Sequence, residues 1–187
     1  MKLESDLYKL IPNALPMNLR ISVWQELLTK DYNIGWEDIQ GVEAPFSKSA
    51  YLAHVARREE PRDRFGKNRF EPFEELGIPS EFCQEYHVIM GDKQIDYLAV
   101  NLVFQGQQFW PHTHRRQTSL VYYANLEWHN KWGGETIIYE DDGETFHAAV
   151  PYTPGALLWV APGATHAIRS PSVEAPMYRF TIGMFYD

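Results

Sequence analysis

The sequence predicts a mainly β fold, an antiparallel sandwich or barrel, with helices in the N-terminal part of the chain. From about residue 95, short segments rich in β-branched and aromatic residues recur, which is typical of strands. Six or more short strands at this spacing favour an antiparallel sandwich or barrel. Turn signals separate the segments: Gly133-Gly134, Asp142-Gly143, Pro154-Gly155 and Pro162-Gly163. The expected strands are 97–104, 118–125, 135–140, 144–150, 155–161 and 177–186.

Residues 1–90 carry helical signals instead. A helix capped by Asn18 is expected, because the apolar residues from Ile21 to Leu28 follow helical spacing. Ser47 or Ser49 can open a second helix running through residue 56, and 71–86 is a weaker third candidate. Since no repeat or linker divides the chain, we expect one domain, 1–187, with mostly helical support over 1–90 and a β-barrel core over 91–187.

Composition argues against several classes of partner. The 187 residues carry a formal net charge of −8 and an isoelectric point near 5.4, whereas phosphate binding needs a basic stripe. The single cysteine, Cys83, cannot form an internal disulfide. The N-terminal segment does not read as a signal peptide, and no apolar run is long enough to span a membrane. We therefore expect a soluble cytoplasmic protein that binds neither nucleic acid nor membrane.

Three histidines stand out among the seven. If residues 112–114 are extended, alternation puts His112 and His114 on one face of a sheet, and His166 follows the Pro162-Gly163 turn. Such a pair from one strand and a third residue from a distant strand is a common way to hold a metal, and imidazole suits Fe, Zn, Cu and Ni. We predict a metal site at His112, His114 and His166; the alternative is three unrelated core or surface histidines.

The last expected strand contains a charge among apolar neighbours. Arg179 and Thr181 alternate onto the face opposite Phe180 and Ile182. An arginine in this setting is costly unless it meets an anion, and its planar guanidinium suits a carboxylate. A bound ligand's carboxylate is one partner, and an internal Asp or Glu is the other. Arg169 is a second candidate for binding a carboxylate.

Six segments follow one another along the stretch 97–186: Asn101 in YLAVNLVF, PHTH (111–114), LVYYANLEW (120–128), WGGET (132–136), PYTPGALLWVAPGATH (151–166) and YRFT (178–181). In this order they resemble the iron(II)- and 2-oxoglutarate-dependent oxygenases, especially the short prolyl-hydroxylase-like members of bacteria and phages. His166 precedes Arg179 by 13 residues, as the family's distal histidine precedes its arginine. The resemblance covers about half the chain.

This resemblance implies a double-stranded β-helix, the jelly-roll or cupin-like barrel, buttressed by the N-terminal α-helices. It implies that His112 and His166 bind iron(II), and that Arg179 and Thr181 hold the distal carboxylate of 2-oxoglutarate. Tyr122 or Asn125 would reach the cosubstrate from the neighbouring strand. Reaction with O2 would convert 2-oxoglutarate to succinate and CO2 and hydroxylate a C–H bond of a small molecule or a side chain.

Two residues are candidates for contacting the substrate. Arg116, with Arg115 beside it, could attract an anionic substrate at the pocket mouth, and a solvated loop is the alternative. Trp132 could form part of the pocket wall, although core packing is the alternative for any one tryptophan. A homo-oligomer is possible.

The chain departs from the family at His114, which stands where the family's His-x-Asp motif has its carboxylate. Either the centre has three histidine ligands, or His114 does not bind and the position is open. Glu135 is a weak replacement candidate. A rival interpretation uses the same residues: Gly106 followed by HTH resembles the first cupin motif, with Gln117 near the place of its Glu. The chain would then be a three-His dioxygenase that needs no 2-oxoglutarate. A metal-dependent binding protein or an inactive homologue is a further alternative.

Overall fold

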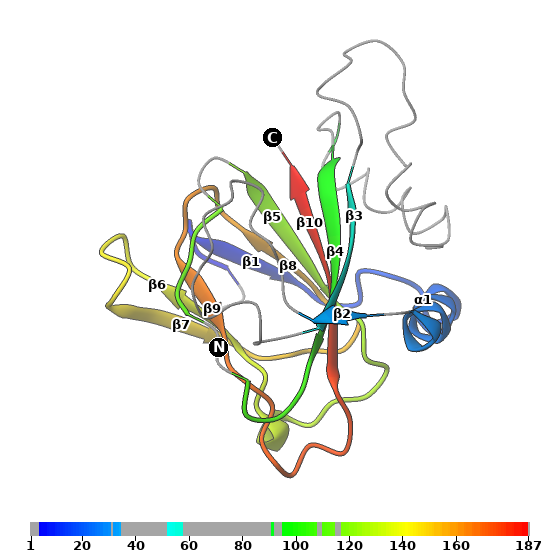
Figure 1. Ribbon diagram of the computed structural model, residues 1–187. Coiled ribbons are helices and arrows are strands. Elements are labelled where there is room, and N and C mark those ends of the chain that lie inside the picture. The colour runs from blue at the N-terminus through cyan, green and yellow to red at the C-terminus, as the bar shows by residue number, and fades with distance from the viewer. Residues whose placement is uncertain are drawn as a thin grey trace.

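The computed structural model describes residues 4–30, 32–34, 52–57, 91, 95–107, 110–114 and 117–186. Two antiparallel sheets carry the fold, with helix α1 on one side of the larger sheet and the smaller sheet on the other (Figure 1). The larger sheet has the strand order β1-β8-β5-β10-β4-β3-β2, and the smaller sheet has the order β7-β6-β9. This is the predicted jelly-roll arrangement, although the two sheets do not close into a barrel.

The strands of the larger sheet are β1 (Tyr8–Ile11), β2 (Asn33–Ile34), β3 (Leu52–Arg57), β4 (Ile95–Val103), β5 (Thr118–Tyr123), β8 (Leu157–Val160) and β10 (Arg179–Tyr186). Those of the smaller sheet are β6 (Thr136–Tyr139), β7 (Phe146–Val150) and β9 (His166–Ile168). The six predicted strands correspond to β4, β5, β6, β7, β8 and β10 and are confirmed. The predicted turns flank β6, β7 and β8, and Gly143, Gly155 and Gly163 in them adopt positive φ angles of 71°, 75° and 78°.

In the N-terminal half, the observed secondary structure differs more from the prediction than it does in the C-terminal half. Helix α1 (Met17–Thr29) exists, but it begins before Asn18, and Pro16 at its N-cap makes no side-chain capping hydrogen bond. The helix expected through residues 51–56 is wrong, because β3 pairs there along the edge of β4, from Leu52 opposite Leu102 to Arg57 opposite Tyr97. A short apolar run is compatible with both the helical and the strand period of hydrophobicity. Such a run becomes a strand where the edge of a sheet is available for pairing. The third candidate helix, 71–86, lies outside the described residues.

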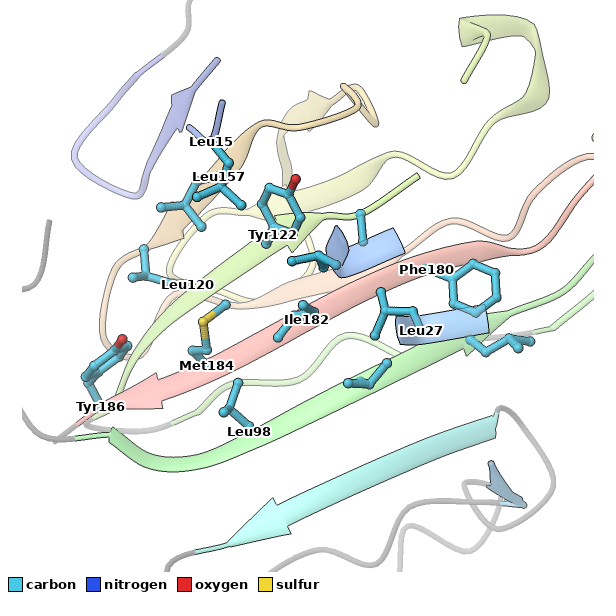
Figure 2. Packing of buried hydrophobic residues seen from close by; sticks show 14 residues of the cluster. Leu15, Leu27, Leu98, Leu120, Tyr122, Leu157, Phe180, Ile182, Met184 and Tyr186 are labelled. Atoms are coloured by element: carbon cyan, nitrogen blue, oxygen red, sulfur yellow. The ribbon is translucent and has the colours of Figure 1, made fainter. Parts of the chain in front are cut away.

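Two buried clusters lie on the two faces of the larger sheet. One packs α1 against β10, where Phe180, Ile182 and Met184 alternate along the strand and Leu27 of the helix lies over Phe180 and Ile182 (Figure 2). The other lies between the two sheets and includes Ile138 and Val150 from the smaller sheet. Because residues alternate along a strand, the other residues of β10 face the space between the sheets. They are Arg179, Thr181, Gly183 and Phe185.

Among the described residues, the structure contains no helix long and apolar enough to cross a membrane.

Candidate metal centre

The three predicted histidines come together at one edge of the smaller sheet. His112 and His166 face each other in an antiparallel bridge, in which each N–H donates to the other's carbonyl, at 3.0 and 2.9 Å. Directly opposed residues project their side chains to the same side of a sheet, and His114 joins them two positions along. The three ring centroids lie 4.6 to 5.1 Å apart.

The ring nitrogens are arranged as a ligand set. One nitrogen from each of His112, His114 and His166 lies within 4.8 Å of the other two. The Nδ1 atoms of His112 and His166 lie 3.0 Å from the carbonyls of Trp110 and Ala164, respectively. If each Nδ1 carries the proton and donates to its carbonyl, Nε2 keeps its lone pair for a metal, which is the usual arrangement behind ligating histidines.

Burial keeps two of the three imidazoles neutral. Burial and then the other two imidazoles lower the pKa of His114 to about 2. Burial and then His112 lower the pKa of His166 to about 3, against an opposing hydrogen bond to the Ala164 carbonyl. Neutral imidazole is the form that binds a metal, so His114 and His166 are in the metal-binding form at neutral pH.

No carboxylate of the described residues belongs to this group, and His114 fills the third position. Glu135, the weak replacement candidate, instead directs Oε2 toward Nη1 of Arg169 at 3.8 Å. Arg169 is thereby engaged with an internal acid, and its side chain is 68% exposed. The described part of the chain therefore offers a three-histidine site.

The carboxylate-binding candidates face the same inter-sheet space. Phe185 of β10 packs its ring against His114, with centroids 4.4 Å apart. Thr181 and Arg179 follow on the same face of that strand. Thr181 lies directly between Tyr123 of β5 and Asn101 of β4. One strand face thus leads from the histidines to Arg179.

Arg179 is a buried cation without a carboxylate partner among the described residues. It has 0% exposure, and its Nε donates to the carbonyl of Gly134 at 2.9 Å. Burial lowers the pKa of the guanidinium, while Tyr123, Tyr152 and Glu135 raise it. Nη1 and Nη2 have no hydrogen-bond partner within the described part of the chain.

The hydroxyl of Thr181 is also buried and has no partner among those residues. Buried donors without partners are rare and mark missing groups. Two guanidinium nitrogens and a hydroxyl together suit a carboxylate, so the residues present fit a bound carboxylate ligand.

Two aromatic rings lie close to the guanidinium of Arg179. Its Cζ lies 4.8 Å from the ring centroid of Tyr152 and 5.5 Å from that of Tyr123. Such cation–π contacts stabilise a desolvated cation by about 2 kcal/mol. Burial raises the pKa of both tyrosines, so they stay neutral.

Tyr122 and Asn125, the two residues expected to reach the cosubstrate, are both buried. Tyr122 faces the α1 side of the larger sheet, in the cluster with Leu157 and Leu120 (Figure 2). The one-residue alternation of β5 puts Tyr123 in the inter-sheet space instead. The side chain of Asn125 is 0% exposed and is bonded to Tyr152 and to the backbone around Arg179.

The structure describes one of the two residues predicted to contact the substrate. Trp132 lies in the short 3-10 helix η2 (Asn130–Trp132), where its ring contacts Trp128 and His129. Trp128 in turn contacts Tyr152 at 4.9 Å, and the contact of Trp132 with the substrate stays a prediction. Arg116 lies outside the described residues.

Tyr152 and Gly134 are the site residues that sequence reasoning missed. Tyr152 lies in the segment 151–166 that carries part of the family resemblance, but its position in a loop gave no sign of a role beside Arg179. Gly134 does carry a signal, the double glycine of WGGET. Its φ is 84°, and a Cβ there would lie 3.2 Å from Cδ of Arg179. The glycine lets the backbone approach the arginine.

No family model matches the sequence, and no curated protein does. Solved structures do match. A prolyl-4-hydroxylase of Pseudomonas putida gives a TM-score of 0.60 at 16% identity, over 96% of this chain and 91% of that one. A Trichoplax adhaerens prolyl hydroxylase, in complex with a peptide fragment of a hypoxia-inducible factor, gives 0.62 at 16% identity, over 98% and 84%.

A third similar structure is HygX from Streptomyces hygroscopicus, with nickel and 2-oxoglutarate bound. It gives a TM-score of 0.60 at 10% identity, over 96% of this chain and 82% of that one. The chain therefore has the fold of 2-oxoglutarate-dependent oxygenases.

Proposed function

We propose that this protein is a cytoplasmic non-haem iron(II)- and 2-oxoglutarate-dependent oxygenase that hydroxylates a small molecule or a side chain. One observation carries the proposal: a fully buried Arg179 with both Nη atoms unbonded within the described chain, on the strand face that leads to three clustered histidines. The fold likeness to structures that hold a metal and 2-oxoglutarate supports it.

The proposal gives the histidines and the Arg179–Thr181 pair different tasks. His112, His114 and His166 would hold iron(II), and Arg179 with Thr181 would hold the distal carboxylate of 2-oxoglutarate. When bound, iron and 2-oxoglutarate supply the oxidising power: O2 and the oxo acid give succinate and CO2, and one oxygen atom enters a C–H bond. Phe185, packed on His114, keeps an apolar surface beside the centre and helps to exclude water.

The rival function, a three-His dioxygenase without 2-oxoglutarate, is favoured by one feature, the third histidine. It leaves the unbonded groups of Arg179 and Thr181 without a role. A binding protein or an inactive homologue would share the metal site but would release no succinate.

Anaerobic titration separates these functions. Adding 2-oxoglutarate to the iron(II)-loaded protein under argon should produce a weak visible charge-transfer band, and the Arg179→Gln variant should need more 2-oxoglutarate to reach it. Iron binding without any band would contradict the proposal and favour the rival dioxygenase. Succinate release after oxygen is admitted would rule out a protein that only binds metal.

A further inference from the structure

The position of Arg179 is held by contacts that are not a salt bridge. Within the described residues its guanidinium is fixed by a single hydrogen bond, from Nε to the Gly134 carbonyl, and by the Tyr123 and Tyr152 rings. A side chain with many rotamers needs further restraint if its two free nitrogens are to point in one direction.

Asn125 supplies restraint at the backbone. Its Nδ2 donates to the carbonyl of Tyr178 at 2.9 Å, and its Oδ1 accepts from the N–H of Phe180 at 2.8 Å. These two peptide groups are the ones immediately before and after Arg179. The amide of Asn125 therefore spans the arginine and fixes the direction in which its side chain leaves β10.

Tyr152 connects this backbone clamp to the guanidinium. Its hydroxyl lies 2.6 Å from Oδ1 of Asn125 and 2.5 Å from the Phe180 carbonyl, and it accepts from the Asn125 N–H at 3.1 Å. Its ring lies beneath the guanidinium at 4.8 Å. One residue thus touches both the clamp and the charged group.

Trp128 packs against Tyr152. Its ring centroid lies 4.9 Å from that of Tyr152, and its Nε1 donates to the Gly133 carbonyl at 2.9 Å. The next carbonyl, that of Gly134, accepts from Arg179. The arginine is consequently restrained at its backbone, its Nε and its flat face, while Nη1 and Nη2 have no hydrogen-bond partner among the residues that the structure describes.

We propose that Asn125 and Tyr152 are positioning residues that aim Arg179 at a terminal carboxylate, and so set a preference for 2-oxo dicarboxylates over 2-oxo monocarboxylates. This inference rests on the proposed function. It gives Asn125 a role other than the predicted direct contact with the cosubstrate, because its Oδ1 accepts from the Phe180 N–H and one of its two amide N–H groups donates to the Tyr178 carbonyl.

The test compares two ligands that differ only in the terminal carboxylate, 2-oxoglutarate and 2-oxopentanoate. Their dissociation constants are measured by calorimetry under argon with iron(II)-loaded wild type, Tyr152→Phe and Asn125→Ala. Loss of a restraining hydrogen bond should weaken 2-oxoglutarate about tenfold and change 2-oxopentanoate by less than about twofold.

Tyr32→Phe is the matched control. Tyr32 also donates a partly buried hydroxyl hydrogen bond to a backbone carbonyl, that of Leu27 at 2.8 Å, but in the α1 cluster. It should lose similar thermal stability and keep the wild-type ligand preference. A purely structural role for Tyr152 would make the two variants behave alike, and that result would overturn the inference.

A double-mutant cycle completes the test. In an Arg179→Gln background, Tyr152→Phe should have no further effect on 2-oxoglutarate affinity; an undiminished effect would overturn the inference. If Asn125→Ala does not fold, Tyr152→Phe carries the test alone. A wild type with no preference between the two ligands would contradict the proposed function itself, whereas a preference that Arg179→Gln removes and Tyr152→Phe leaves intact would contradict only the positioning role.

Discussion

His112 and His166 are joined through their backbones, each N–H donating to the other's carbonyl. Residues 54 positions apart in the chain are thereby fixed opposite each other by two hydrogen bonds that need no metal. Preorganised ligands bind with less loss of conformational entropy. The fold alone therefore brings the candidate ligands together, and the contribution of each histidine to metal binding can be tested separately.

Replacing His114 should weaken metal binding strongly. Losing only the hydrogen-bond partner of a metal ligand reduces affinity by about 10- to 100-fold, so His114→Ala should reduce it by at least about a hundredfold. Competition with a chelator for Co(II) measures the change. His147→Ala is the control, because His147 pairs with Glu140 at 2.8 Å outside the cluster.

The His114→Asp variant tests whether the third histidine is functional. Because the position is packed for an imidazole ring against Phe185, we expect a lower rate of succinate formation than in wild type. Faster succinate formation would instead indicate that His114 replaced an ancestral carboxylate ligand and reduced the activity.

The metal-free protein should become less stable in acid. The pKa values of His114 and His166 are lowered to about 2 and about 3, against about 6.5 in the unfolded chain. Below pH 6.5 the unfolded chain takes up protons that the folded chain refuses. The free energy of unfolding should therefore fall between pH 6.5 and 3, by at most about 1.4 kcal/mol per pH unit for each histidine.

Urea unfolding of the metal-free protein at pH 7.5, 6.0 and 5.0 measures this slope. A variant with His114→Gln and His166→Gln should show a flatter dependence on pH. An equal slope in both proteins would assign the acid sensitivity to other groups.

Sequence pattern predicted the β half of the molecule well, because those strands alternate or are bounded by Gly and Pro turns. It also predicted the meeting of His112, His114 and His166, which alternation and a turn are enough to suggest. The roles proposed for these residues stay predictions. The strand β9, which carries His166, was missed because three residues are too few to show a period.

Other features depend on contacts that local sequence does not contain. The pairing of β3 with β4 overrides an apolar spacing that also fits a helix. Tyr122 and Tyr123 are chemically identical neighbours, so only the register of β5 against β10 decides which one faces Arg179. The hydrogen bond from the Phe180 N–H to Oδ1 of Asn125 joins residues 55 positions apart. A pairing at this distance cannot be predicted from local sequence.

Gly134→Ala should disturb Arg179 through direct contact. Its added Cβ would lie 3.2 Å from Cδ of Arg179, at a φ of 84°. Gly143→Ala is the matched control, since its φ is 71° but its nearest neighbour, Thr165 Oγ1, is 3.6 Å away. Both variants should lose about 1 kcal/mol from the unfavourable φ. Only Gly134→Ala should also weaken 2-oxoglutarate binding. Calorimetry measures the affinity and thermal melting measures the stability. Equal affinities in the two variants would contradict an effect of the Gly134–Arg179 contact on 2-oxoglutarate binding.

Thr181→Val and Tyr122→Phe form the last comparison, since each removes one buried hydroxyl from opposite faces of the same sheet. The Thr181 hydroxyl faces the inter-sheet space and has no partner within the described chain, so its loss should weaken 2-oxoglutarate binding about tenfold and leave stability nearly unchanged. Tyr122 interacts with Arg20 on the α1 side, so its loss should lower stability by about 1 kcal/mol and leave 2-oxoglutarate affinity as in wild type. Calorimetric titration and urea unfolding of both variants give the two quantities. The reverse pattern would place the cosubstrate on the α1 face and contradict the orientation of the site.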